Sequence, residues 1–368
     1  MIYFDYAANY PAKKEVLETL IETEKNYFGN YNSSHFLGKK TKEFVKLCTE
    51  NILKIMGFSN DFEIIYTSSA TESNNLAIKG ISCAYSGYGR KILVSELEHS
   101  SNNATLGYLK ELGYSIELIK TTNSGEFDFN DLKSKLTDDV ILVCCILVDG
   151  ETGFIHDIKR TYEIIKTSKN AKLLVDATQG VGKLKVDLNY ADLVSFTPHK
   201  FGGIIGSGLL IKRKNIPLIP LIHGGESSSL YRSGSVPVGI IASDLKAIEI
   251  AYSNIDKNYN YVKEINNYLI NKLKKINNVT INSFNNPYIV NISIKNILGA
   301  KIVEYLSDNG ICVSQKSACS IKNTPSKIIM AIYKDRKRAL TSFRISLSEL
   351  TTKDEIDILI KRIEELAK

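Results

Sequence analysis

Short apolar runs alternate with helical patterns between residues 60 and 211 of the chain. Each run has the length and composition of a buried strand. Seven such runs occur, at 63–67, 91–95, 115–119, 140–148, 172–176, 191–196 and 208–212. Helical spacing of apolar residues predicts helices at 39–56, 73–83, 101–112 and 157–168. The alternation predicts an α/β fold, in which helices cover a mostly parallel seven-stranded sheet.

The pattern changes after residue 240. The segment 240–275, rich in Asn and Lys, predicts one long helix that bridges two domains. It is followed by alternating and helical segments typical of a smaller α+β domain, at 279–294, 301–309, 311–314, 343–346 and 352–368. We therefore expect a large domain at 12–255, and a small domain formed by 1–11 and 256–368.

Length and charge narrow the possible functions. A chain of 368 residues is long for a single core and suits two domains. Its net charge of +7 is modest, and no basic block with interleaved aromatic residues indicates direct nucleic-acid binding. No run approaches the length of a membrane-spanning helix, and the first residues lack the pattern of a signal peptide. We expect a cytoplasmic protein without membrane contact.

The six cysteines show no spacing typical of a zinc site, so no metal is expected. Cys144 and Cys145 lie in an apolar run and are expected to be buried core thiols. Disulfides are not expected in a reducing compartment, which leaves room for one reactive thiol.

A carboxylate and a lysine follow two neighbouring predicted strands. Asp176 ends the run 172–176, and Lys200 follows the run 191–196. Pyridoxal phosphate (PLP) enzymes need this pair, because a lysine amine forms a Schiff base with the cofactor aldehyde and a carboxylate keeps the pyridinium nitrogen protonated. Ligands of such sheets lie beyond the carboxyl ends of the strands, where both residues fall.

Two strand-to-helix turns carry weaker signals. In 66–73, Ser69 and Glu72 have the spacing of a capping box, and a helix N-terminus with free N–H groups favours a phosphate. An ordinary helix cap explains the same residues. His99 follows the strand 91–95 and could stack on a flat ring, although a surface or capping role is equally compatible with a lone histidine.

Two residues near the C-terminus could serve a substrate. Cys319 lies among small and polar residues in 315–320, a context that fits an exposed nucleophilic thiol or an incidental surface cysteine. Arg344 lies on the predicted strand 343–346, where a guanidinium could bind a carboxylate bidentately or form a structural salt bridge.

Taken together, these motifs resemble those of the cysteine desulfurases of the class V aminotransferase family, which are PLP enzymes of fold type I. The resemblance covers nearly the whole chain and follows the family order. It is carried by the segments 3–8, 29–35, 70–77, 98–99, 175–179, 195–200, 223–225, 232–235, 317–320 and 343–347.

The resemblance implies roles around the cofactor. Lys200 would be the Schiff-base lysine, Asp176 the pyridinium partner, Gln179 the contact of the ring hydroxyl, and His99 the stacking residue. Phosphate contacts would come from Ala70, Thr71, Thr197 and His199. Ser235 would reach the phosphate from the other subunit, which implies a homodimer with shared active sites.

The resemblance also implies the substrate chemistry. Arg344 would bind the carboxylate of L-cysteine, with Asn30 as a further substrate contact. Cys319 would take the substrate sulfur as a persulfide, leaving L-alanine, and would pass the sulfur to an acceptor protein. The context of Cys319 resembles the branch whose long, mobile loop serves iron–sulfur cluster assembly or tRNA thiolation.

The chain departs from the family pattern at one point near the cofactor. Asp149 and Gly150 stand where two asparagines are usual. Gly150 supplies no side chain, and Asp149 adds a negative charge that could disfavour a thiolate or carboxylate. These changes bear on rate and substrate more than on fold or PLP binding.

Two other hypotheses remain open at this point. One is another PLP lyase on the same scaffold, such as a selenocysteine lyase. The other is a PLP-bound partner protein with impaired catalysis, against which the presence of Lys200, Asp176, Cys319 and Arg344 argues.

Overall fold

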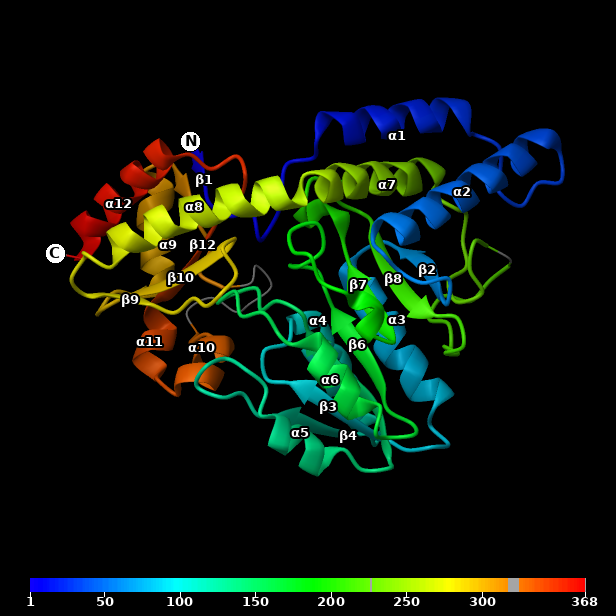
Figure 1. Ribbon diagram of the computed structural model, residues 1–368, viewed down its shortest axis with the longest axis horizontal. Coiled ribbons are helices and arrows are strands. Elements are labelled where there is room, and N and C mark those ends of the chain that lie inside the picture. Colours follow the sequence, from blue (N-terminus) through cyan, green and yellow to red (C-terminus); the bar gives the residue numbers. More distant parts are fainter. Residues whose placement is uncertain (226, 317–323, 368) are drawn as a thin grey trace.

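A computed structural model describes residues 1–225, 227–316 and 324–367. Its largest element is a seven-stranded sheet, as predicted (Figure 1). In spatial order the strands are β2 (Phe62–Thr67), β8 (Gly208–Arg213), β7 (Leu193–Phe196), β6 (Lys172–Asp176), β5 (Val140–Ile146), β3 (Lys91–Ser95) and β4 (Ser115–Ile119). β8 pairs antiparallel with both of its neighbours, β2 and β7, and all the other pairings in this sheet are parallel. The predicted mostly parallel α/β fold is therefore confirmed.

Helices cover both faces of this sheet, because successive strand residues point to opposite sides. On β6, Leu174 packs in the core with α3 and α4, whereas Leu173 and Val175 pack in the core that includes α2, α6 and α7. The helices that accompany the sheet are α1 (Lys14–Asn26), α2 (Phe36–Ile55), α3 (Ala70–Ala84), α4 (Ser100–Glu111), α5 (Phe129–Lys135), α6 (Ile158–Ile165) and α7 (Val238–Ser253).

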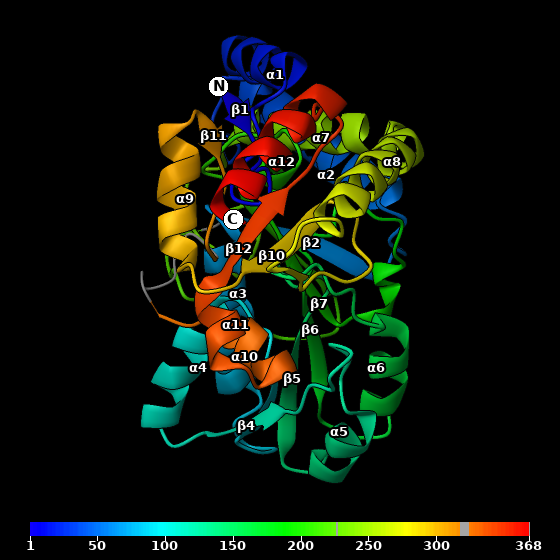
Figure 2. The same ribbon diagram turned by 90° about the vertical axis from the view of Figure 1, so that its left-hand side faces the viewer.

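The C-terminal part contains a second, antiparallel sheet with the order β12-β10-β9 (Figure 1), and Figure 2 shows β12 beside β10. Its strands and those of a small parallel pair are β9 (Val279–Ile281), β10 (Ile289–Ile294), β12 (Ser342–Ser346), β1 (Ile2–Tyr3) and β11 (Ile311–Cys312). The helices of this part are α8 (Ile255–Leu273), α9 (Gly299–Asp308), α10 (Lys327–Tyr333), α11 (Arg336–Thr341) and α12 (Lys353–Ala367). The β1–β11 pairing ties the N-terminus to this C-terminal part.

One predicted element is wrong in its extent. The segment 240–275 is two helices, because α7 ends at Ser253 and α8 begins at Ile255. Asn254 lies between them, and its side-chain amide donates to the Ile250 carbonyl at 2.9 Å. Such a local side-chain bond competes with the backbone ladder and interrupts the helix. Among the described residues no helix is both long and apolar enough to cross a membrane.

Candidate active site

A cavity of about 650 Å³ opens where the carboxyl ends of β6 and β7 face the N-terminal segment and β12. Its size falls within the ordinary range of small-molecule sites. It brings together most of the residues selected from the sequence: Ala70, Thr71, His99, Asp176, Gln179, Thr197, His199, Lys200 and Arg344. Glu98, Asp149, Gly150, Glu151, Lys316, Thr324 and Lys327 also line it.

Lys200 ends a short 3-10 turn, Pro198–Lys200, that directly follows β7. Its Nζ donates to the carbonyl oxygens of Ala7 at 3.0 Å and Ala8 at 2.6 Å. The turn folds back so closely that a Cβ on Gly203 would collide with Pro198, which requires glycine there. The lysine amine is thus held at the cavity wall by the N-terminal segment.

Asp176 is the last residue of β6 and is 3% exposed. One carboxylate oxygen accepts from the side-chain amide of Asn74 at 2.9 Å, and the other accepts from the backbone N–H of Thr178 at 3.0 Å. Asn74 is itself fixed by the hydroxyl of Ser195. These bonds orient a buried carboxylate toward the cavity, where it can pair with a cationic ring nitrogen.

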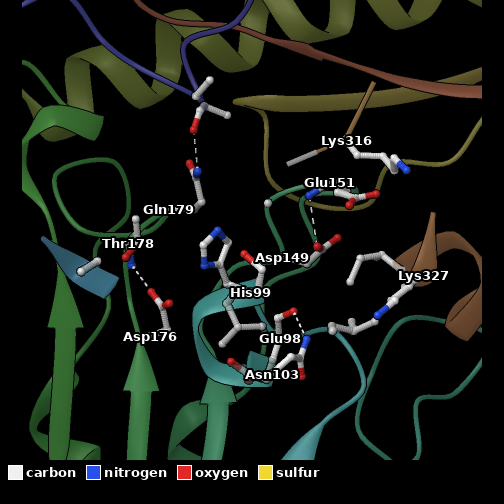
Figure 3. A pocket seen from close by; sticks show the side chains of 18 of the residues that line it. Glu98, His99, Asn103, Asp149, Glu151, Asp176, Thr178, Gln179, Lys316 and Lys327 are labelled. Atoms are coloured by element: carbon white, nitrogen blue, oxygen red, sulfur yellow. Dashed lines mark hydrogen bonds between the residues drawn. The ribbon is translucent and has the colours of Figure 1, made fainter. Parts of the chain in front are cut away.

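His99 is the N-cap of α4 and lies at the centre of the cavity, between Gln179 and Asp149 (Figure 3). Its Nδ1 accepts the backbone N–H of Ser101 at 3.2 Å, so the neutral ring carries its proton on Nε2. Burial lowers the pKa of His99. The charge of Asp176 opposes this shift, and the charge of the nearby Lys200 adds to it. A neutral, oriented imidazole of this kind can stack on a flat ring.

The start of α3 and the turn after β7 form the end of the cavity suited to a phosphate. Ser69 accepts the N–H of Glu72 at 3.1 Å, which forms the N-cap half of the predicted capping box, whereas the Glu72 carboxylate accepts the N–H of Ser68, one residue before the N-cap, at 2.7 Å. Ala70 and Thr71 are the first two residues of the helix. Their N–H groups lie at the cavity and favour an anion.

Thr197 and His199 complete this end. The Thr197 hydroxyl donates to the Ser207 carbonyl at 2.7 Å and lies 2.8 Å from Nδ1 of His199. Because its single proton is already donated, it accepts from Nδ1, which therefore carries the proton of the neutral ring. Burial lowers the pKa of His199 to about 4, with Lys200 and Lys183 adding to the effect. A bound phosphate would favour the protonated ring.

Arg344 lies on β12 and is 2% exposed. One terminal nitrogen donates to the Asp5 carboxylate at 2.8 Å, and the other donates to the Gly150 carbonyl at 2.8 Å. Its Nε is buried and has no acceptor among the described residues. Each terminal nitrogen has a second N–H beyond these bonds, and Arg344 lines the cavity, as a carboxylate-binding arginine requires.

The departure at residues 149–150 has a local structural explanation. Asp149 turns its carboxylate into its own turn, accepting from the N–H groups of Glu151 at 3.1 Å and Thr152 at 2.6 Å and from the Thr152 hydroxyl. Burial nevertheless raises the pKa of Asp149. A Cβ on Gly150 would meet Gln179 at 3.8 Å, an ordinary contact, so glycine leaves open space rather than meeting a steric need.

Gln179 and a neighbouring lysine form a pair that the sequence did not reveal. The Gln179 amide donates to the Ala7 carbonyl at 2.8 Å, and its oxygen accepts from Lys183 at 3.1 Å. Burial, together with the charges of Lys200 and Arg344, lowers the pKa of Lys183 to about 7. Lys183 lies behind the cavity wall, and its local sequence gave no signal beyond an ordinary surface lysine.

Glu98 is a second group whose state the sequence did not predict. It lines the cavity floor at 4% exposure (Figure 3). Burial, together with the negative charges of Asp176 and Asp149, raises the pKa of Glu98 to about 8. The carboxyl is therefore largely protonated at neutral pH.

Two selected residues, Asn30 and Ser235, do not line this cavity of the single chain. Asn30 is exposed in the loop between α1 and α2, and its side chain accepts the N–H of Asn32 at 2.9 Å. Ser235 lies before α7 and does not line the cavity. Cys319 falls outside the described residues. The roles of these three residues stay predictions.

Comparisons with known proteins agree with this geometry. The profile of the class V aminotransferases matches residues 2–359. Cysteine desulfurase IscS of Dictyoglomus turgidum is 36% identical over 376 residues, which covers 99% of this chain and 95% of that protein. A NifS/IcsS protein homolog of Lactobacillus delbrueckii is 31% identical, covering 100% of this chain and 97% of that protein.

Solved structures extend the likeness to the fold. A NifS-like protein superposes with a TM-score of 0.91 at 29% identity, covering 99% of this chain and 98% of that one. The NifS-like protein from Rickettsia africae gives a TM-score of 0.88 at 28% identity, covering 100% and 99%. The chain therefore belongs to the class V aminotransferase family, whose members use PLP, and within it to the cysteine desulfurases.

Proposed function

We propose that this protein is a PLP-dependent cysteine desulfurase that converts L-cysteine to L-alanine and a persulfide on Cys319. The observation that carries the proposal is the convergence of Lys200, Asp176 and Arg344 on one cavity, from segments far apart in the sequence. Its curated relatives with the same coverage are named cysteine desulfurases.

The residues present fit PLP. The N-terminus of α3 with Thr71, together with Thr197 and His199, would hold the phosphate. His99 would stack on the ring, and Gln179 would contact the ring hydroxyl. The buried Asp176 carboxylate would pair with the ring nitrogen. When bound, the cofactor supplies the aldehyde for amine attachment and an electron-accepting ring.

Lys200 would hold and move the proton of the reaction. Its amine donates to the carbonyl oxygens of Ala7 and Ala8 at 3.0 Å and 2.6 Å. Whenever the amine is not joined to the cofactor, these bonds hold it in one position, from which it can donate a proton. Asp176 would stabilise positive charge at the ring nitrogen.

Arg344 would bind the carboxylate of L-cysteine through its remaining N–H groups. Cys319 would then attack the substrate sulfur as a thiolate. Its role is supported by the two described residues that flank positions 317–323, Lys316 and Thr324, since both line the cavity. The Lys316 ammonium also donates to the Thr324 carbonyl at 2.8 Å, which joins the two ends of this segment beside the cavity.

The assembly and the pathway complete the proposal. We propose a cytoplasmic homodimer, in which Ser235 reaches the phosphate in the site of the partner subunit, and we propose Asn30 as a further substrate contact. The position of Ser235 away from the cavity of its own chain is compatible with such sharing. The persulfide would be passed to an acceptor protein for iron–sulfur cluster assembly or tRNA thiolation. The domains would be 12–255, and 1–11 with 256–368.

The test is turnover by the purified protein loaded with PLP. L-Cysteine should yield L-alanine and, with a reductant, an equal amount of sulfide. Cys319→Ser should abolish sulfide release from cysteine. Retained selenide release from selenocysteine by that variant would favour a selenocysteine lyase. A PLP-bound protein without turnover of either substrate would indicate an impaired partner protein.

A further inference from the structure

The side chain of Asp5 connects the N-terminal segment to the proposed substrate arginine. Asp5 and Arg344 are 339 residues apart in the chain, and their ion pair is 2.8 Å long. We propose that Asp5 is a positioning residue, which fixes the Arg344 guanidinium so that its free N–H groups meet the carboxylate of the amino-acid substrate. This inference rests on the proposed function.

The backbone around Asp5 is fixed on both sides. The N–H of Phe4 donates to the Cys312 carbonyl at 2.8 Å, and the N–H of Ser346 donates to the Phe4 carbonyl at 2.7 Å. Ala7 donates to the Ser346 hydroxyl at 2.9 Å. Asp5 therefore lies beside β12 in a set register, and its carboxylate is a fixed point for Arg344.

The bond to Asp5 helps to fix the orientation of the Arg344 guanidinium plane. An arginine has five N–H groups in one plane. One is bound by Asp5 and one by the Gly150 carbonyl, on different terminal nitrogens. Two anchors on two nitrogens prevent rotation of the plane and leave one N–H on each terminal nitrogen for a ligand, while the Nε–H is buried. Without Asp5, the plane would turn about its single remaining anchor and lose the bidentate match to a carboxylate.

Asp5 also has a purely electrostatic effect that must be separated from positioning. Arg344 is buried, and an unpaired buried charge is costly, so loss of Asp5 would destabilise the folded protein whatever its role. A structural role alone would weaken the binding of every amine ligand equally. A positioning role weakens only the ligands that carry a carboxylate.

The test compares L-alanine with ethylamine, which differ only by the carboxylate, in the PLP-loaded protein. Dissociation constants are read from the change in cofactor absorbance. Asp5→Ala should weaken L-alanine binding roughly tenfold to a hundredfold and change ethylamine binding by less than about twofold. Asp5→Asn keeps an acceptor oxygen and should restore most of the L-alanine affinity. For L-cysteine, the KM of Asp5→Ala should rise by a similar factor with little change in kcat.

Glu349→Gln is the matched control. Glu349 also ties the N-terminal segment to the C-terminal part, through the Tyr10 hydroxyl at 2.8 Å and Lys13 at 3.0 Å, but has no bond to Arg344. It should leave the ratio of L-alanine to ethylamine affinity unchanged. Equal weakening of both ligands by Asp5→Ala, or no weakening of L-alanine, would overturn the inference. If the wild-type protein fails to release sulfide, the proposed function is overturned instead. The comparison of L-alanine with ethylamine binding still tests the role of Asp5 in that case.

Discussion

The cavity has two walls that are built differently. The sheet wall, made of His99, Asp176 and Lys200, takes each side chain from the end of a strand in one parallel sheet or the turn that follows it. The arginine wall, made of Asp5, Gly150 and Arg344, combines three segments that share no local pattern. The first wall is rigid through its own secondary structure, whereas the second is held by side-chain bonds between distant segments.

This difference separates two tasks. The sheet wall carries the groups proposed to bind and activate the cofactor, and their positions follow from strand ends that are buried on both faces. The arginine wall carries the group proposed to recognise the substrate. A change in the sheet wall should therefore affect the chemical step most strongly, and a change in the arginine wall should affect substrate binding most strongly.

Lys200→Ala is expected to have the largest effect. Loss of the amine proposed to attach the cofactor should reduce L-alanine formation from L-cysteine by at least about a thousandfold. The measurement is a timed assay of L-alanine with matched protein and PLP. Lys183→Met removes the neighbouring buried lysine behind the wall and should reduce the rate by less than about tenfold. Comparable losses in the two variants would contradict the assigned roles.

Asp176→Asn should have the next largest effect. The substitution keeps the shape but removes the negative charge that would balance the protonated ring nitrogen. We expect kcat to fall by about a hundredfold or more, with a shifted absorbance band of the bound cofactor. The band and the rate are measured on the same preparation. An unchanged kcat would show that this carboxylate does not act on the cofactor.

Arg344→Lys tests the arginine wall. A lysine keeps the charge but cannot bind a carboxylate through two parallel N–H groups or satisfy both Asp5 and Gly150. The KM for L-cysteine should rise roughly tenfold to a hundredfold, with a smaller change in kcat. Steady-state kinetics give both constants. A fall in kcat at constant KM would place Arg344 in the chemical step and remove the distinction between the walls.

Asp244 lies outside both walls, so the substitution Asp244→Asn should affect only the stability of the protein. Burial on α7 raises the pKa of Asp244 from 3.8 to about 8, against the opposing bond from Ser207. The folded protein thus keeps a proton that the unfolded chain loses above about pH 4. This residue therefore makes stability fall between about pH 4 and pH 8.

The variant does not titrate at this position, so it should melt about 5 °C or more above the wild type at pH 9 and show a smaller difference at pH 5. Thermal melts at the two pH values measure this gap. Turnover at pH 7 should be unaffected. A gap that is larger at pH 5 would contradict the sign of the argument.

The sheet wall could be predicted from the sequence because its signals are local. A run such as 172–176 predicts a buried strand, and the polar residue that ends it must lie at the carboxyl edge of the sheet. The antiparallel direction of β8 was not predictable, because a short apolar run has the same composition in either direction. The helix break at Asn254 was missed because asparagine also occurs within helices.

The arginine wall could be predicted only in part. Arg344 was selected as a candidate, but its pairing with Asp5 depends on the parallel β1–β11 contact, which leaves no periodic signal in two strands of two residues each. Lys183 was missed for a similar reason, since its burial comes from packing against the N-terminal and C-terminal segments. Long-range packing, rather than the local sequence pattern, determines the contacts and the burial of these groups.

We propose that the cofactor is attached to Lys200 and to no other lysine near the cavity. This attachment is tested by reducing the PLP-loaded protein with borohydride, which makes the lysine–cofactor bond permanent, and mapping the labelled peptide by mass spectrometry. Lys183 is the informative rival, because burial lowers its pKa to about 7 and leaves its amine partly neutral. A single label on Lys200 is expected. A label on Lys183, Lys316 or Lys327, or no label at all, would contradict it.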